Sequence, residues 1–189
     1  MRCLDEKFNQ LQDMTPYFVK VMQRMATPGW ETAETAQDIH SLCLIYEGEM
    51  LLETGGREYI ASRGDLVYLR PGEPRRIKAH QQSPFHCYEV DFLYTCLQWN
   101  ECCWSFTEPP LPFAPVTGID DPCLLSRLLE LFSELNKEWH STRPNRVNYC
   151  RALFTEIVTS LLITHGELPV NYDKIRKVEK IIKYLIDHY

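Results

Sequence analysis

The sequence predicts an α+β protein, mainly β, in which a β-barrel is followed by two antiparallel helices and the start of a third helix. Three observations support this order. Up to about residue 118, the apolar runs are short, rich in aromatic and β-branched residues, and separated by glycine and proline. A proline-rich passage, EPPLPFAPVTG, then occupies residues 108–118. Beyond it, apolar residues recur every three or four positions, as they do along one face of a helix.

These changes divide the chain into three expected parts. Residues 1–118 form the barrel, with an N-terminal arm over about residues 1–25. Residues 119–168 form a helical segment. Residues 169–189 contain a linker and one further helix. A chain of 189 residues with 44% hydrophobic side chains can bury a sizeable core.

Eight apolar runs are the candidate strands, and seven or eight strands at this spacing are typical of a sandwich or barrel. They are Tyr17–Met25, Trp30–Ala36, His40–Tyr46, Met50–Glu53, Glu58–Ala61, Leu66–Leu69, Arg76–Ala79 and Phe85–Phe92. Thr54-Gly55-Gly56 predicts a hairpin turn between the fourth and fifth runs, because adjacent glycines supply the positive φ angles that it needs. Pro71-Gly72 predicts another turn.

Charge and cysteine content exclude several classes of protein. The formal net charge is −6, which argues against this chain binding the phosphate backbone of a nucleic acid by itself. The N-terminal sequence contains no apolar run typical of a signal peptide, and no stretch is long enough to span a membrane. The eight cysteines contain no C-x-x-C pair, so free thiols in a reducing cytoplasm are expected.

The helical part begins at Asp121-Pro122, because aspartate caps free backbone amides and proline suits the first helical position. One apolar stripe then follows at spacings of four, three and four residues: Leu124, Leu128, Leu131 and Leu135. The periodicity predicts a second helix from about Arg146 to His165, which Gly166 ends. A third helix with a basic polar face begins near Asp173, and its abrupt end at Tyr189 suggests a truncated chain.

The segment LCLIYEGEMLLETGGREYIASRGDLVYLRPGEPRRI, followed by FHCYEVDF, resembles the cupin-type (jelly-roll) regulatory domain of the AraC family of bacterial transcription regulators. The shared frame consists of Gly48, a hairpin, Gly64-Asp65, Pro71-Gly72 and a strand that ends at Phe92. KIRKVEKIIKYLIDHY resembles the first helix of that family's DNA-binding domain, whose two helix-turn-helix motifs are absent here.

The resemblance implies a domain that binds a small-molecule effector, forms a homodimer and contacts DNA only through the missing helix-turn-helix domain. Metal-binding cupins place a histidine after the Pro-Gly turn, whereas this chain has Arg75 there. A guanidinium is permanently charged and cannot ligate a metal ion. We therefore expect no metal, no cofactor and no catalysis, and a barrel that senses a sugar or a related polar metabolite.

Several residues are candidates for contacting that effector. Arg75 could reach into the barrel and bind a carboxylate, phosphate or hydroxyl group, or it could be a solvated arginine at the rim. Glu47 and Asp91 match positions that contact sugar in a sugar-sensing member of the family, although the residue types differ. Trp104 matches that member's stacking aromatic residue, and Trp30 is a weaker candidate of the same kind. Each tryptophan could instead belong to the core.

The strand Phe85–Phe92 alternates in a way that adds Glu89 to these candidates. Val90 and Phe92 share one face with His86, which we interpret as a structural histidine. Glu89 and Asp91 share the other face, which points either to solvent or into the cavity.

Two further questions stay open at this stage. The leucine stripe of residues 124–135 fits packing on the barrel and a dimer interface equally well. The barrel could also be a metal-free isomerase or epimerase that uses a carboxylate and His86 as acid and base, or a solid dimerisation module without a ligand. The interior of the barrel distinguishes these possibilities.

Overall fold

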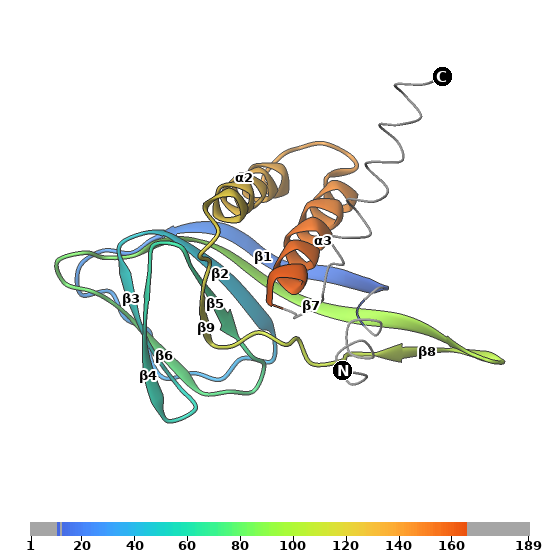
Figure 1. The fold of residues 1–189 in the computed structure, drawn as a ribbon, viewed down its shortest axis with the longest axis horizontal. Coiled ribbons are helices and arrows are strands. Elements are labelled where there is room, and N and C mark those ends of the chain that lie inside the picture. The colour runs from blue at the N-terminus through green and yellow to red at the C-terminus, as the bar shows by residue number, and fades with distance from the viewer. Residues whose placement is uncertain (1–10, 12, 166–189) are drawn as a thin grey trace, which may run out of the picture.

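Two antiparallel sheets face each other and form the barrel, as Figure 1 shows. The structure, a computed structural model, describes residue 11 and residues 13–165. The larger sheet contains, in spatial order, β1 (Met14–Met25), β7 (His86–Asn100), β2 (His40–Glu47), β5 (Asp65–Leu69) and β9 (Val116–Gly118). The smaller sheet contains β4 (Arg57–Ser62), β3 (Glu49–Thr54) and β6 (Arg75–Ala79). A final strand, β8 (Cys103–Thr107), pairs with the far end of β7.

Glycines make the sharpest connections between these strands. Gly55 and Gly56 both have positive φ angles and connect β3 to β4, with Thr54 paired to Arg57. The predicted hairpin is therefore present. Gly48 has a φ of 72°, and a Cβ atom at this position would lie 2.1 Å from the carbonyl oxygen of Pro84. Only glycine fits between β2 and β3.

Helices α2 (Pro122–Trp139) and α3 (Arg146–His165) cover the outer face of the larger sheet (Figure 1). The side chain of Asp121 caps α2 by accepting a hydrogen bond of 2.9 Å from the backbone amide of Cys123, and Pro122 is the first helical residue. Both helix starts agree with the sequence prediction. The helices follow the barrel in sequence and pack on it from one side.

The larger sheet is buried on both faces, because successive residues of each strand point to opposite sides. In β2, Leu42 and Leu44 point toward the helices, whereas Cys43 and Ile45 point into the barrel. The residues on the helix side join a large core that includes both helices. Those on the barrel side join a second core that includes residues of the smaller sheet.

The predicted fold class is confirmed, with differences at particular elements. Residues 30–36 do not form a strand. Their backbone pairs with β6 at two isolated bridges, Glu31 to Lys78 and Thr35 to Arg75, rather than along a continuous ladder. Residues 33–38 are exposed at the mouth of the barrel and carry no large apolar side chain that could anchor a continuous ladder.

Strand β7 is longer than the predicted Phe85–Phe92, and β8 and β9 were not predicted. Much of the expected N-terminal arm is β1, an integral strand that pairs with β7 along its length. The third helix, expected from Asp173, lies outside the described residues. Within the described part of the chain, neither helix has the length and apolar character needed to cross a membrane.

Candidate functional site

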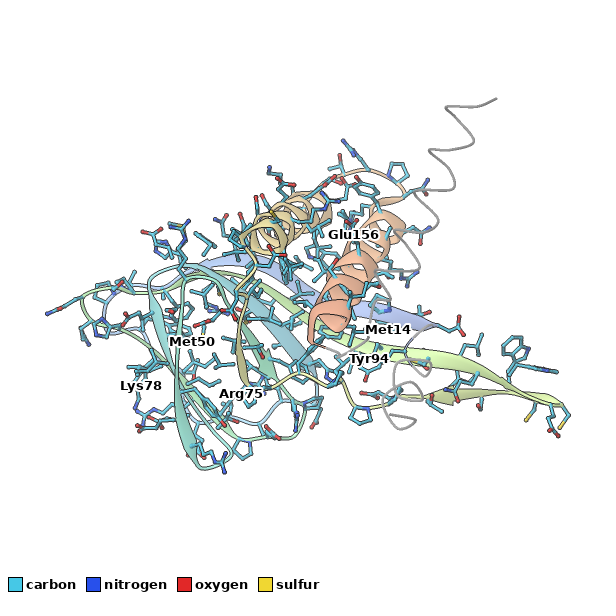
Figure 2. The ribbon with its side chains drawn as sticks, viewed as in Figure 1. Met14, Met50, Arg75, Lys78, Tyr94 and Glu156 are labelled. Carbon is cyan, nitrogen blue, oxygen red and sulfur yellow. The ribbon has the colours of Figure 1, made fainter. Side chains whose placement is uncertain are left out.

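A cavity of about 100 Å³ lies inside the barrel, between the two sheets and the segment that crosses the barrel mouth. This space exceeds the roughly 15 Å³ that one buried water needs. Figure 2 shows Arg75 and Met50 between the two sheets, and both residues line the cavity. Side chains therefore fill part of the barrel interior, and a cavity remains beside them.

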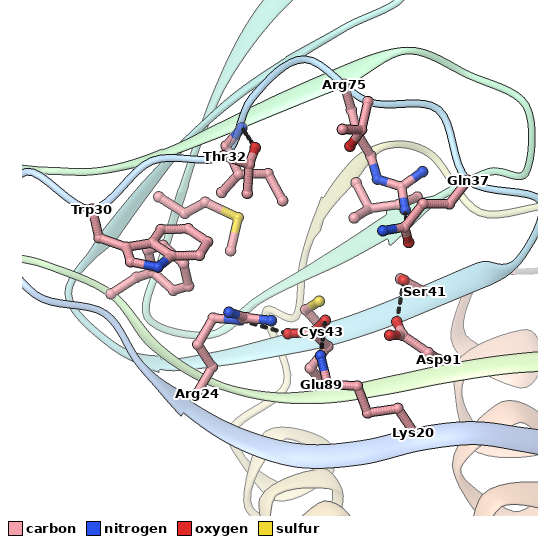
Figure 3. A pocket seen from close by; sticks show the side chains of 15 residues that line it. Lys20, Arg24, Trp30, Thr32, Gln37, Ser41, Cys43, Arg75, Glu89 and Asp91 are labelled. Carbon is pink, nitrogen blue, oxygen red and sulfur yellow. Dashed lines mark hydrogen bonds and ion pairs between the residues drawn. The ribbon is translucent and has the colours of Figure 1, made fainter.

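Arg75 is the first residue of β6, and its side chain points into the cavity (Figure 3). Its backbone amide and carbonyl both bond to Thr35, so the start of the strand is fixed to the mouth segment. The side chain is only 5% exposed. Its Nη2 donates a hydrogen bond of 2.7 Å to Oε1 of Gln37, while its Nη1 is buried without a partner among the described residues.

Burial lowers the pKa of Arg75, because desolvation disfavours its charge. Asp91, Cys43 and Glu89 act in the opposite direction. The interpretation of Arg75 as a solvated arginine at the rim is therefore wrong. Its neighbour Arg76 lies closer to that description, because its side chain is 40% exposed and pairs with Glu31 at 3.0 Å. The Nε of Arg76 is nevertheless buried without a partner among the described residues.

Asp91 lies across the cavity from Arg75, on β7 (Figure 3). Ser41 is its direct neighbour in the β2–β7 register, and the Ser41 hydroxyl donates a hydrogen bond to one oxygen of Asp91. Asp91 is 5% exposed. Burial raises the pKa of its carboxyl group, and the Ser41 hydrogen bond only partly offsets that effect.

Glu89, two residues before Asp91, faces the same cavity. Its carboxylate binds Nε of Arg24 at 2.6 Å and lies 3.8 Å from Nζ of Lys20. The Arg24 guanidinium also stacks over the ring of Trp30 at 5.0 Å. Trp30 lines the same wall and packs edge to face on Phe85.

The lining thus combines three cations with two carboxylates. Lys20 and Arg24 both pair with Glu89, whereas no ion pair joins Arg75 to Asp91. A donor without a partner and a carboxylate with one partner therefore face the same space. A ligand that both accepts and donates hydrogen bonds would satisfy them together.

The structure brings four of the six predicted ligand residues together, namely Arg75, Asp91, Glu89 and Trp30. The other two lie elsewhere. Glu47 is an exposed residue at the end of β2, outside the cavity, and it pairs with Nδ1 of His86 at 3.1 Å. Trp104 is 59% exposed on β8, where it packs against Trp99 at 5.0 Å.

Trp104 therefore does not line the cavity that Arg75 enters, and its predicted contact with an effector there is wrong. Trp104 belongs to a β7–β8 hairpin that projects away from the barrel, as Figure 1 shows. Strand β7 continues well past the barrel wall, and the sequence carries no signal for that length.

The leucine stripe of α2 is accounted for by packing within the chain. Leu128, Leu131 and Leu135 are fully buried against the sheet and α3, and Leu124 is partly buried at the edge of the same core. These side chains are not available to a second chain in this arrangement. A dimer through the helical segment would have to use another face of it.

The polar lining residues that sequence reasoning missed include Lys20, Arg24, Gln37 and Ser41. One signal was present for Ser41, because it alternates with the apolar Leu42 in a strand and thus faces the side opposite the helices. The other three depend on how β1 and the mouth segment cross the barrel. No described histidine lines the cavity, so the acid–base pair expected of an isomerase with His86 is not assembled there.

Comparison with known proteins gives two kinds of similarity. Residues 22–147 match the family model of the AraC-like ligand binding domain. No curated protein matches the chain.

Among solved structures, a cupin 2 conserved barrel domain protein from Salinispora arenicola is 18% identical, with a TM-score of 0.35 over 43% of this chain and 77% of that one. The plu4264 protein from Photorhabdus luminescens is 12% identical, with a TM-score of 0.35 and the same coverage. An oxalate decarboxylase from Bacillus subtilis is 20% identical, with a TM-score of 0.33 over 38% of this chain and 20% of that one.

The family match covers β2–β7, which build most of the barrel, together with all of α2. It also contains every residue of the cavity except Lys20. The chain belongs to the family of proteins with an AraC-like ligand-binding domain.

Proposed function

We propose that the chain is the effector-sensing and dimerising part of an AraC-like transcription regulator of the cytoplasm. It binds a sugar or a related polar metabolite in the barrel cavity. DNA contact falls to a helix-turn-helix domain outside these residues, and the part described here performs no catalysis.

One observation carries the proposal: Nη1 of Arg75 is buried and has no partner among the described residues, and Arg75 lines a cavity that Asp91 also lines. An unpaired buried donor costs free energy, roughly 1–3 kcal/mol. A hydroxyl group can accept from Arg75 and donate to a carboxylate, so a hydroxylated ligand suits both walls. Trp30, rather than Trp104, supplies the aromatic surface for the apolar face of a sugar ring.

Strand β1 offers a physical route from the cavity to the helices. Lys20 and Arg24 of β1 line the cavity. From the other face of the same strand, Phe18 contacts Trp139 of α2 and Phe154 of α3, with ring centroids 5.7 and 5.5 Å apart. A ligand that shifts the charged side chains of β1 would thereby change how the helices pack. Regulation requires such a difference in contacts between the ligand-free and the ligand-bound protein.

A thermal-shift screen against sugars, sugar acids, other organic acids and amines tests the proposal. A compound that binds the folded chain raises its melting temperature by mass action. We expect hydroxylated compounds to give the largest shifts, and Arg75→Met to remove those shifts while Arg76→Met keeps them.

A screen in which no hydroxylated compound stabilises the parent protein would contradict the proposal, as would stabilisation that survives Arg75→Met. Nuclear magnetic resonance of the sugars after prolonged incubation addresses the enzymatic alternative. We expect unchanged spectra, whereas conversion to an isomer would identify the barrel as an enzyme.

A further inference from the structure

Three side chains of metal-ligating type lie close together on the barrel side of the larger sheet. Sγ of Cys43, Sγ of Cys87 and a carboxylate oxygen of Glu89 all lie within 4.8 Å of one another. Both cysteines are buried, and the Glu89 side chain is 13% exposed. This cluster uses neither Arg75 nor Asp91, and the proposed sensing of a polar metabolite does not depend on it.

The sheet itself brings the three residues together. Cys43 of β2 lies directly opposite Glu89 of β7 in the register of the two strands. Cys87 precedes Glu89 by two positions on β7, so its side chain points to the same face. Sites that are built on paired strands hold their donors more rigidly than sites on loops.

The arrangement suits a tetrahedral ion. Zinc binds thiolates at about 2.3 Å, which places two sulfur ligands of one ion roughly 3.8 Å apart. The donor atoms lie within 4.8 Å of one another, so they would have to move closer together to hold one ion. Cys43 and Glu89 also line the cavity, so the fourth coordination position would face the open space and accept water or a small ligand.

The surrounding cations favour the ionised form of the ligands, and it is the ionised ligands that attract a metal ion. Two thiolates and one carboxylate carry three negative charges, and a divalent ion leaves one of them uncompensated. Arg24, at 2.6 Å from one oxygen of Glu89, and Lys20, at 3.8 Å from the other, carry two positive charges, which more than compensate the one that remains. Without metal, the hydrogen bond to Cys87 and burial hold the pKa of Cys43 well above its ordinary value, so the Cys43 thiol is neutral.

We propose that Cys43, Cys87 and Glu89 form a binding site for one thiophilic metal ion, such as Zn²⁺, with its fourth position open to the barrel cavity. Binding releases two thiol protons to solvent. Sulfur ligands select Zn²⁺ and Cd²⁺ over Mg²⁺ and Ca²⁺. The expectation of a metal-free barrel came from Arg75 and the missing histidines, and it did not consider cysteines that are distant in sequence and meet only in the folded sheet.

The test uses the full chain with Cys102→Ser and Cys103→Ser, which removes the exposed thiol pair at the hairpin tip. Cd²⁺ is titrated and followed by thiolate charge-transfer absorption, and Zn²⁺ is titrated against a chromophoric chelator. We expect one ion per chain, no response to Mg²⁺, and release of two protons per ion in weakly buffered solution.

Further substitutions in that background locate the site. Cys43→Ser with Cys87→Ser should abolish binding, whereas Cys150→Ser, at a buried thiol in the helical core, should preserve it. Glu89→Gln should weaken Zn²⁺ binding by at least about tenfold, the lower range for losing even an indirect metal partner.

Absence of stoichiometric binding in the Cys102→Ser/Cys103→Ser chain would overturn the proposal even if the cysteine double variant fails to fold. Binding that persists without Cys43 and Cys87 would also overturn it. Because no effector is present, these outcomes leave the polar-metabolite proposal to its own test.

Discussion

The two faces of strand β7 are both largely buried but are built from opposite chemistry. Val90 and Phe92 point to the helices and lie in an apolar core, where Phe92 packs on Phe154 with ring centroids 4.7 Å apart. Glu89 and Asp91, which alternate with them, point into the barrel and line its cavity. Burial alone therefore does not distinguish a face that stabilises the fold from a face that binds a ligand.

Opposite energetic consequences follow for the two faces. Apolar burial on the helix side stabilises the fold by roughly 25 cal/mol per Å². On the barrel side, Arg75 and Asp91 are desolvated without forming an ion pair, which costs stability in the ligand-free protein. Substitutions on the two faces should therefore change stability in opposite directions.

The largest effect is expected on the helix side. Phe92→Ala removes a fully buried ring that contacts Phe154, so the free energy of unfolding should fall by about 3–5 kcal/mol. Urea denaturation followed by circular dichroism measures this change. A loss below about 1 kcal/mol would contradict the difference between the two faces, because the helix-facing side chains would then contribute no more to stability than surface residues do.

On the barrel side, Arg75→Met should leave the ligand-free protein as stable as the parent or more stable, by up to about 1–3 kcal/mol. The substitution removes a buried donor without a partner among the described residues and its desolvated charge. Arg76→Met is the matched control. That arginine pairs with Glu31 on the surface, and its loss should change stability by less than about 0.5 kcal/mol. A large destabilisation by Arg75→Met alone would show that the guanidinium is structural.

The raised pKa of the Asp91 carboxyl group predicts that the free energy of unfolding depends on pH. Between the ordinary value of 3.8 and the folded value, the folded protein holds a proton that the unfolded chain has released. The free energy of unfolding therefore falls as pH rises through this window. Asp91→Asn should remove this contribution, so its stability relative to the parent should increase from pH 3.8 upward. A difference that is constant with pH, or that decreases, would contradict the assigned direction.

The smallest effect is expected at Trp104, which lies far from the cavity on the projecting hairpin. Trp104→Ala should change effector affinity by less than about 0.5 kcal/mol, on the scale of surface substitutions. Trp30→Ala, at the cavity wall, should cost roughly 1–3 kcal/mol of binding, on the scale of one large buried side chain. Calorimetry on the two variants compares them directly. A greater loss of affinity in Trp104→Ala than in Trp30→Ala would support the sequence-based assignment of Trp104 as an effector-binding residue.

Local patterns in the sequence predicted much of the fold. Asp121-Pro122 and the 3-4 spacing of apolar residues located both helices, because caps and periodicity are local properties. Adjacent glycines predicted the β3–β4 turn for the same reason. The segment 30–36 was misassigned because its residue types suit a strand, whereas the actual path over the barrel mouth depends on its contacts with β6.

The cavity was only partly predictable. Alternation along Phe85–Phe92 separated Glu89 and Asp91 from the core residues, but it left open which face pointed into the barrel. Gln37 and Arg24 contribute through contacts with Arg75 and Glu89 that join distant parts of the chain. Trp104 was misplaced because an aligned position does not reveal that β7 extends beyond the barrel wall.

The most direct test of a barrel face built for binding is calorimetry of the strongest effector from the screen, with the parent, Arg75→Met and Arg76→Met. The affinity of Arg75→Met should be lower by roughly 1–3 kcal/mol for a neutral hydroxylated ligand, because the hydrogen bond of Nη1 to the ligand is lost. Arg76→Met should bind as the parent does. If Arg75→Met folds and binds the effector as tightly as the parent, the unpaired guanidinium is not a ligand-binding group, and the cavity described here is not where the effector binds.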